Sequence, residues 1–311
     1  MFDLTALSRA VAAHARVARV VIADFKGSSP REVGAAMLVW ADGQSGTIGG
    51  GALEWQAAQR ARDMLAAGGQ RLDHEALGPK LGQCCGGAVT LLTEVYHAAN
   101  LPAPTPVIAR ATDGSAMPLA VKRLIDRARG QGQAPAPQLL QGWMVEPLAT
   151  PTRQLWIWGA GHVGRALVSV LAPLPGVAIT WVDTGAERFP PDMPANVSAL
   201  PVADPALAVA LAPRTAEHLV LTYSHALDLE LCHRLLSYGF SACGLIGSAT
   251  KWVRFRARLS ALGHSSTAID RIDCPIGDPS LGKHPQAIAI GVASHFLTRR
   301  SRGQIRENTG S

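Results

Sequence analysis

The residues best suited to chemistry are the glycines of the segment Gly159–Gly164 (GAGHVG), which directly follows the apolar run Leu155–Trp158. In a turn that joins a strand to a helix, the first of three glycines at this spacing permits the tight bend and the second lets the backbone approach a phosphate. The third allows close helix–strand packing. The helix that follows presents unpaired N–H groups and its positive dipole end. A chance glycine loop is the alternative. The pattern predicts a site for a phosphate-bearing ligand at Gly159, Gly161, His162 and Gly164.

Polar residues also follow the next predicted strands. Asp183 ends the second strand, 19 residues after the last of these glycines, where an acid can accept a hydrogen bond from a ribose hydroxyl. Ser224 and His225 follow a later strand, and Ser248 follows the one after it. In a doubly wound sheet ligands bind beyond the carboxyl ends of the strands, so we expect these residues to converge on one edge. The serines could instead cap helices, and His225 could form an acid/base pair with Asp228 or act as a simple hydrogen-bond donor.

The first half of the chain carries two further turns that suit an anion. Gly49, Gly50 and Gly51 precede a helical run, and adjacent glycines remove the Cβ barrier and leave amides free to bind an oxyanion. A plain tight turn is the alternative. The segment Gly27–Arg31 (GSSPR) places an arginine, which binds oxyanions through two nitrogens, in a second turn. An ordinary surface turn explains that segment equally well.

The most unusual segment contains adjacent thiols, Cys84 and Cys85, followed by Gly86 and Gly87. Neighbouring side chains on an extended chain point apart, so we expect the two cysteines to have different roles. A thiol flanked by free amides can have a lowered pKa, which favours nucleophilic or metal-ligand chemistry. Burial of a cysteine as a small apolar side chain is the alternative. No second ligand pair stands at a spacing typical of structural zinc.

Two domains are needed to position these segments. Residues 1–98 predict an N-terminal domain of mixed α/β structure, with a helix over 2–12, strands over 17–25, 35–40 and 88–95, and a helix over 52–65. Residues 99–152 are rich in proline and glycine and predict a connector, with a possible last strand of the first domain at Gln141–Pro147.

After residue 152 strands and helices alternate, which predicts βαβ units and a parallel sheet. The expected strands are Leu155–Trp158, Ala178–Val182, Val197–Val202, Leu219–Tyr223 and Ser241–Ile246. The fold class is therefore α/β, with a Rossmann-type doubly wound domain over 153–298. It ends in a helix near Pro285–Leu297, and a basic tail follows over 299–311.

Composition narrows the class of protein. Of the 311 residues, 48% are hydrophobic and 17% are charged, so large cores can form. The net charge of +6 fits an anionic ligand weakly, and neither zinc-finger spacing nor an aromatic–basic stripe indicates nucleic acid. No secretory signal and no run of about 18 apolar residues is visible. Five cysteines without a framework spacing predict free thiols in the cytoplasm.

Several of these segments together resemble the blocks of the XdhC/CoxI family, whose members are accessory proteins for xanthine dehydrogenase and related molybdenum hydroxylases. The blocks run in order from residue 27 to residue 293, so the resemblance covers nearly the whole chain. They are GSSPR (27–31), GTIGGGALE (46–54), GQCCGG (82–87), GAGHVG (159–164), TYSHALDLE (222–230), GLIGSATK (244–251) and GKHPQAIAIGVA (282–293).

The resemblance implies a chaperone without turnover of its own. Such a protein binds the molybdenum cofactor (molybdopterin carrying molybdenum) as cargo and protects it. It holds the cofactor while a cysteine desulfurase supplies the sulfido ligand, and then inserts it into the apo-enzyme. The family fold is an XdhC/CoxI domain followed by a Rossmann domain, and homodimers are expected. By its place in the CCGG block, Cys85 is the cysteine expected near the molybdenum, beside Gly86 and Gly87, with Cys84 second.

One departure from the family concerns the loop after Asp183. Members tend to carry an arginine shortly beyond this aspartate, where the present chain has Gly185, and Arg188 is the residue that could substitute. Two other functions remain open. An NAD(P)-dependent oxidoreductase would explain the glycine fingerprint with Asp183, but not the GGG and CCGG loops. The other alternative is a docking protein whose Rossmann domain binds no ligand.

Overall fold

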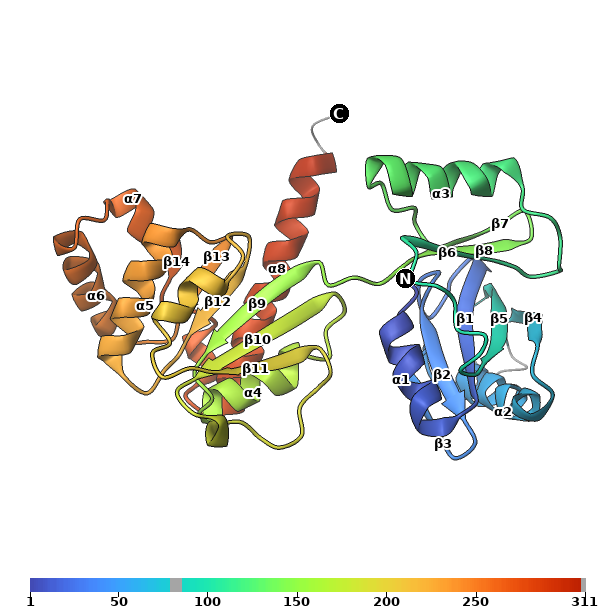
Figure 1. Cartoon of the computed structure of the whole chain (residues 1–311), viewed down its shortest axis with the longest axis horizontal. Helices are drawn as coiled ribbons and strands as arrows, with labels where there is room; N and C mark the ends of the chain where they lie inside the picture. The colour runs from blue at the N-terminus through green and yellow to red at the C-terminus, as the bar shows by residue number, and fades with distance from the viewer. Residues whose placement is uncertain (79–85, 309–311) are drawn as a thin grey trace. The chain divides into compact units, whose positions relative to one another are not determined.

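The computed structural model describes residues 1–78 and 86–308. The chain divides into two compact units, Met1–Thr150 and Pro151–Ser311. In Figure 1 the first unit runs from blue to green and the second from yellow-green to red. No helix among the described residues is long and apolar enough to cross a membrane.

The first unit is built on an antiparallel sheet with the order β3-β2-β1-β5-β4. β1 lies at its centre and is buried from Val17 to Ala23, which explains why this stretch is apolar apart from Arg19. β4 and β3 were missed in the sequence because their mostly polar residues show no clean alternation. The strands are β1 (Val17–Lys26), β2 (Ala36–Trp40), β3 (Gly43–Gly46), β4 (Gln70–Ala76) and β5 (Ala88–Tyr96).

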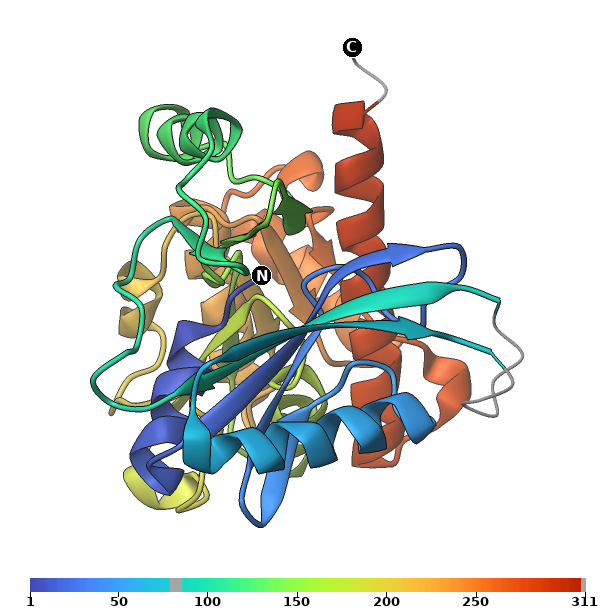
Figure 2. The same cartoon turned by 90° about the vertical axis from the view of Figure 1, so that its right-hand side faces the viewer.

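Further layers cover both faces of this sheet. Helix α2 (Gly51–Ala67) packs on one face through its buried leucine and alanines, and Figure 2 shows it lying along the sheet. Helix α1 (Leu4–His14) and a second sheet lie on the other face. The second sheet has the order β6-β8-β7, and helix α3 (Leu119–Gln131) packs on it. Its strands are β6 (Val107–Ala111), β7 (Gln138–Leu140) and β8 (Trp143–Pro147).

The segment 99–152 therefore contains a sheet and a helix where its proline and glycine content predicted a connector with one last strand. The prolines lie mostly in the loops, whereas the short strands and α3 supply apolar residues. Val121 of α3 packs with Val107 and Val145 in one small core. The compact first unit includes this segment as far as Thr150.

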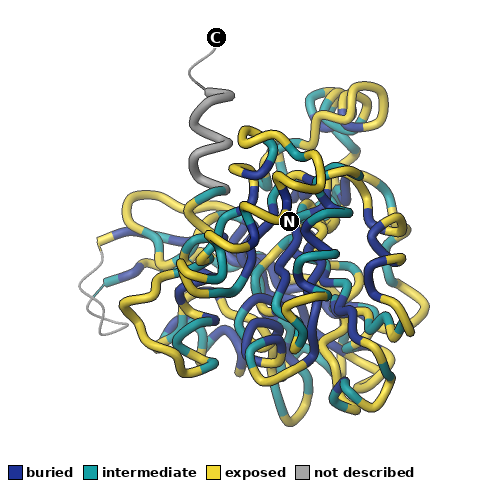
Figure 3. The backbone as a smooth tube through the Cα atoms, turned by 90° about the vertical axis from the view of Figure 1, so that its left-hand side faces the viewer, coloured by how far each residue is buried: buried dark blue, intermediate teal, exposed yellow. Residues whose placement is uncertain are grey.

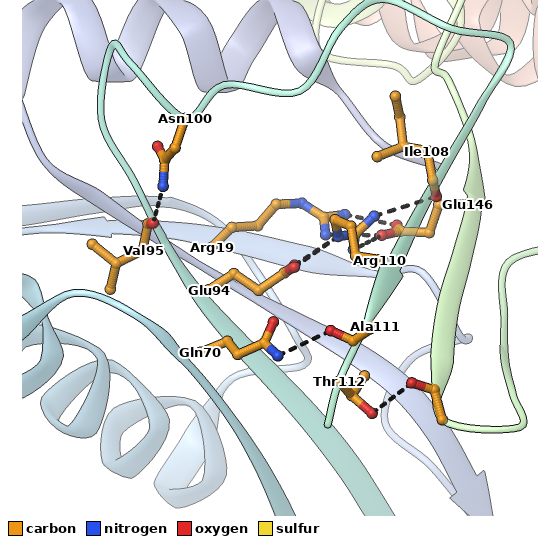
Figure 4. Close-up of polar contacts among 11 residues, drawn as sticks. Arg19, Gln70, Glu94, Val95, Asn100, Ile108, Arg110, Ala111, Thr112 and Glu146 are labelled. Atoms are coloured by element: carbon orange, nitrogen blue, oxygen red, sulfur yellow. Dashed lines mark hydrogen bonds and ion pairs between the residues drawn. The ribbon is translucent and has the colours of Figure 1, made fainter. Parts of the chain in front are cut away.

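A buried ion-pair network joins the two sheets of the first unit (Figure 4). Arg19 of β1 donates to both carboxylate oxygens of Glu146 on β8, at 2.9 and 2.7 Å. Arg110 of β6 donates to Glu146 at 2.7 Å and to Glu94 of β5 at 2.7 Å. The ring of Phe2 lies against both guanidinium groups, at 4.4 and 4.8 Å. The two positive and two negative charges compensate each other, so the network is structural.

The second unit is a parallel sheet with the order β11-β10-β9-β12-β13-β14. Numbered from the first strand of the unit this is 3-2-1-4-5-6, the Rossmann order, in which the direction of winding reverses between β9 and β12. The predicted fold class is thereby confirmed. The strands are β9 (Arg153–Trp158), β10 (Val177–Asp183), β11 (Val197–Pro201), β12 (Glu217–Val220), β13 (Ala242–Leu245) and β14 (Ile272–Asp273).

Helices cover both faces of this sheet. Figure 3 colours the backbone by burial, with buried segments in dark blue inside exposed ones in yellow. Alternate residues of β9 serve the two sides: Leu155 and Ile157 face the core with α4 and α8, and Trp156 and Trp158 face the core with α5 and α6. Helix α8 continues to Asn308, where the sequence predicted a tail from residue 299. The helices are α4 (His162–Leu171), α5 (His225–Tyr238), α6 (Ala249–Ala261), α7 (Ser266–Ile269) and α8 (Pro285–Asn308), with short 3₁₀ turns η2 (Ala186–Arg188), η3 (Leu207–Leu211) and η4 (Pro279–Leu281).

Candidate functional site

The glycine turn between β9 and α4 has no room for side chains at its first and last positions. Gly159 has φ +121°, and a Cβ there would lie 2.5 Å from the carbonyl oxygen of Leu221. A Cβ on Gly164 would lie 2.0 Å from the carbonyl oxygen of Gly159. The first glycine thus allows the turn to approach the segment after β12, and the third allows α4 to pack on the turn.

The middle glycine differs, because it faces open space. Gly161 is exposed, and a Cβ added to it would meet nothing within 4 Å. It stands at the N-cap of α4, where no side chain accepts a hydrogen bond. The carbonyl of Gly161 accepts from the amide of Arg165 at 2.9 Å, but the amides of Gly161, His162 and Val163 have no acceptor among the described residues. These three N–H groups form the start of a helix that suits an anion.

Asp183 braces this turn from the end of β10. Its Oδ2 accepts from the amide of Ala160 at 2.5 Å, and its Oδ1 accepts from the amide of Thr184 at 2.7 Å. Burial raises the pKa of Asp183, but these hydrogen bonds and the nearby Arg188 lower it more, so the net shift is downward. The carboxylate is therefore ionised, and both of its oxygens already accept hydrogen bonds from the chain itself.

The serines at the neighbouring strand ends act as helix caps. Ser224 accepts from the amide of Leu227 at 3.3 Å at the start of α5, and Ser248 accepts from the amide of Lys251 at 3.1 Å at the start of α6. His225 is the first residue of α5 and is exposed. All three lie at the carboxyl edge of the sheet, as the strand order requires, and their part in ligand binding stays a prediction.

Asp228 is paired with a lysine, and no contact with His225 supports the suggested acid/base pair. Its Oδ2 accepts from Nζ of Lys251 at 2.6 Å, and its Oδ1 accepts from the amide and hydroxyl of Thr222 at 2.9 and 2.8 Å. Lys251 also donates to the carbonyl of Ile246 at 3.0 Å. Sequence reasoning missed this link. Its signal was a cation in the first turn of a helix, which is unfavourable unless a carboxylate neutralises it.

The triple-glycine turn of the first unit already binds a carboxylate of its own chain. Oε2 of Glu54, in the first turn of α2, accepts from the amides of Ile48 at 2.9 Å and Gly50 at 3.0 Å, and from the hydroxyl of Thr47 at 2.5 Å. The amide of Gly49 donates to the same threonine at 3.0 Å. Burial raises the pKa of Glu54, but these hydrogen bonds lower it more, so the net shift is downward.

The glycine-rich segments of the first unit lie together. A Cβ on Gly87 would lie 2.0 Å from the carbonyl oxygen of Ser28, and one on Gly49 would lie 2.4 Å from Cβ of Pro30. Arg31, expected to bind an oxyanion, is paired with its neighbour Glu32 at 3.0 Å. Gly86, which follows the adjacent thiols in the sequence, is exposed.

Three of the five cysteines lie among the residues that the structure describes. Cys84 and Cys85 lie outside the described residues, so their roles stay predictions. Cys232, Cys243 and Cys274 are free thiols, and burial raises the pKa of Cys243 to about 12. Within the described ranges no group of three or more histidine, cysteine, aspartate or glutamate residues could hold a metal ion.

Comparison with known proteins agrees with this architecture. YqeB of Escherichia coli (strain K12), an uncharacterized protein, is 26% identical over 282 residues, which are 89% of this chain and 42% of YqeB. The chain thus spans about two fifths of that relative. A Bacillus halodurans protein described as a xanthine dehydrogenase has a crystal structure that superposes with a TM-score of 0.69 over 97% of both chains. At 19% identity this likeness shows the fold alone.

Two family models match the chain in the order of its two units. The model of the XdhC and CoxI family matches residues 10–75, which include the GSSPR and GGG turns. The model of the XdhC Rossmann domain matches residues 155–296, which include the glycine turn and all the strand ends described above. The chain therefore belongs to the XdhC and CoxI family.

Proposed function

We propose that this protein binds the molybdenum cofactor as cargo and serves the maturation of xanthine dehydrogenase or a related molybdenum hydroxylase. It protects the cofactor, holds it while a cysteine desulfurase supplies sulfur, and inserts it into the apo-enzyme. Membership of the XdhC and CoxI family supports this role. The observation that carries it is the start of α4, where the amides of Gly161, His162 and Val163 lie at the reversal of the sheet.

The cofactor's pterin carries a phosphate, which suits these amides. A charge-assisted hydrogen bond contributes about 1.5–3 kcal/mol, so a few of them hold a ligand and still permit its release. The buried side chains nearby serve structure: Asp183 braces the turn, and Asp228 is paired with Lys251. Binding without turnover is consistent with such an arrangement.

The phosphate belongs on the second-unit turn in this proposal. The sequence offers both Gly159–Gly164 and Gly49–Gly51 as anion sites, but the amides of Gly49 and Gly50 already donate to Thr47 and Glu54. Cys85 remains the proposed molybdenum-proximal residue, on the basis of its place in the CCGG block. A homodimer is part of the same proposal.

The runner-up is an NAD(P)-dependent oxidoreductase, which the Rossmann strand order favours. For NADP an arginine near the end of the second strand accommodates the 2′-phosphate, and for NAD an acid there accepts from the ribose hydroxyls. Asp183 stands there, but its oxygens accept from Ala160 and Thr184, which argues against this use. Calorimetric titration with NAD⁺, NADP⁺ and purified molybdopterin distinguishes the two functions.

The direct test is anaerobic purification after co-expression with cofactor synthesis genes, followed by metal and pterin analysis. We expect molybdenum and pterin in equal amounts on the wild-type protein. Cys85→Ala should retain less molybdenum, with Cys84→Ala as the matched control. Equal molybdenum content in wild type and Cys85→Ala would refute the role of Cys85. Protein that carries neither pterin nor molybdenum, and transfers none to apo-xanthine dehydrogenase, would refute the function.

A further inference from the structure

Three cations lie near the glycine turn of the second unit, and two of them are held by oxygens of the chain. Arg165 of α4 donates to the carbonyl of Ala160 at 3.3 Å and to the carbonyl of Arg188 at 2.8 Å. Lys251 donates to Asp228 and to the carbonyl of Ile246. The third is the guanidinium of Arg188, for which no hydrogen bond to any described residue is found.

Arg188 is placed between two strand ends that flank the turn. Its Nε lies 3.4 Å from Oδ1 of Asp183, which ends β10, and is buried without a hydrogen-bond partner in the described chain. Its Cζ lies 5.8 Å from the ring centroid of Tyr223, which follows β12. The strand between β10 and β12 is β9, which leads into Gly159–Gly164. The guanidinium therefore lies beside the turn whose amides have no acceptor in the described chain.

The ion pair with Asp183 leaves the guanidinium of Arg188 able to bind another anion. The carboxylate oxygens already accept short hydrogen bonds from Ala160 and Thr184, so the ion pair with the guanidinium is long and lacks hydrogen-bond geometry. The side chain of Arg188 is about two fifths exposed, and Tyr223 is 75% exposed. A forked donor and an aromatic face are thus both accessible at this edge of the sheet.

We propose that Arg188 binds the phosphate of the ligand together with the amides of Gly161–Val163, and that Tyr223 positions its guanidinium. This inference rests on the proposed function, since it concerns the same site, and it specifies the ligand's chemistry. At the end of the second strand the accessible group is a cation, where an NAD-binding domain offers an acid to a ribose diol and an NADP-binding domain places an arginine on the 2′-phosphate. The ligand is therefore a phosphate ester, and its anionic group contacts Arg188.

The test measures binding by the full-length chain, using pyrophosphate, purified molybdopterin, NAD⁺ and NADP⁺ as separate probes. Replacing Arg188 with glutamine should weaken the binding of pyrophosphate and of molybdopterin about 10- to 100-fold, as expected for a lost charge-assisted hydrogen bond. Arg188→Lys keeps the positive charge but not the forked pair of donors, so its affinity should lie between those of the wild type and Arg188→Gln. NAD⁺ should bind more weakly than pyrophosphate to the wild-type protein.

Arg214→Gln is the matched control, because it removes the same charge from another arginine–tyrosine pair. The guanidinium of Arg214 lies 5.1 Å from the ring of Tyr238, and Arg214 precedes β12, at the opposite end of the strand from Tyr223. This variant should bind all probes as the wild type does. Tyr223→Leu keeps every charge and should weaken binding less than Arg188→Gln, which tests the site without altering Arg188 itself.

The outcomes separate this inference from the proposed function. Molybdopterin binding that is equal in wild type and Arg188→Gln overturns the inference and leaves the function standing. Arg188-dependent binding of pyrophosphate or NADP⁺ without molybdopterin binding supports the inference and contradicts the function. Tight NAD⁺ binding that is insensitive to Arg188 contradicts both. Thermal unfolding of each variant shows whether a loss of binding reflects a loss of fold, and Arg188→Lys and Tyr223→Leu decide the matter if Arg188→Gln does not fold.

Discussion

The two glycine turns of this protein look alike in sequence but differ in what their amides do. In the first unit, the amides of Ile48 and Gly50 donate to Glu54, a carboxylate supplied by the helix that the turn precedes. In the second unit, the amides of Gly161 and His162 find no acceptor in the described chain. A glycine-rich turn before a helix therefore indicates an anion site for a ligand only where the chain does not bring its own anion.

The largest expected effect distinguishes the packing glycine from the ligand-facing glycine of the second turn. Gly164→Ala would place a Cβ 2.0 Å from a backbone oxygen, so the turn or the helix must move. We expect a loss of about 3 kcal/mol or more in the free energy of unfolding of the second unit. Urea denaturation measures it, and an unchanged midpoint would show that α4 does not pack on the turn as described.

The second effect is a difference between the two units in how their free energy of unfolding depends on pH. His218 of β12 is buried beside Trp158, whose indole donates to it at 3.2 Å, and burial lowers the pKa of His218 to about 3. Its pKa in the unfolded chain is higher, so the second unit has its full stability above about pH 6.5 and loses it as the pH falls toward 3. Between pH 6.5 and 5 we expect a loss of roughly 2 kcal/mol.

The free energy of unfolding of the first unit should not change over this pH range. Burial raises the pKa of Glu146, but Arg19 and Arg110 lower it more, to about 2. That contribution is present above the ordinary pKa of a glutamate and is lost only as the pH falls toward 2. Urea denaturation at pH 7 and pH 5 measures the difference, and His218→Asn should flatten the pH dependence of the second unit. Equal pH dependence in wild type and variant would contradict the assignment to His218.

The third effect concerns the carboxylate that the first turn binds. Glu54→Gln should destabilise the first unit by about 1–2 kcal/mol, because the amides of Ile48 and Gly50 lose a charged acceptor. Since the pKa of Glu54 is lowered by folding, the contribution is present above its ordinary pKa and is lost as the pH falls through the lowered value. The exposed Glu32→Gln is the control, with an expected change of about 0–1 kcal/mol. Similar losses for the two variants would remove the special role of Glu54.

The smallest effect on folding is expected at Gly161. Its φ is −73° and its Cβ position is open, so Gly161→Ala should change the free energy of unfolding by less than about 1 kcal/mol. The same methyl group would stand where an anion must approach the amides, so pyrophosphate binding should weaken. Calorimetry on a folded variant checks this, and wild-type affinity would place the anion elsewhere.

Much of the second unit could be predicted from the sequence, because its signals are local. The run Leu155–Trp158, the turn Gly159–Gly164 and the strand-ending Asp183 stand at the spacings that a Rossmann unit requires. The carboxyl edge of the sheet then follows from the strand order alone. The pairing of Asp228 with Lys251 was missed because the lysine reaches it from the next helix, and the unfavourable cation in the first turn of that helix was the one local sign of it.

The first unit was harder to predict because its contacts are distant in sequence. β4 has no regular alternation, and β6 and β8 are short strands separated by α3. Arg19 meets Glu146 across 127 residues, so no local pattern could reveal the network that joins the two sheets. The capping of the glycine turn by Glu54 is local, but a first-turn acid is also what helix electrostatics favours in general.

The most direct test of the difference between the two turns is a titration of the ¹⁵N-labelled protein with pyrophosphate, followed by amide resonances. We predict that the amides of Gly161, His162 and Val163 shift as the anion binds, and that those of Gly49 and Gly50 do not. Shifts at Gly49 and Gly50, with Gly161–Val163 unchanged, would contradict the account.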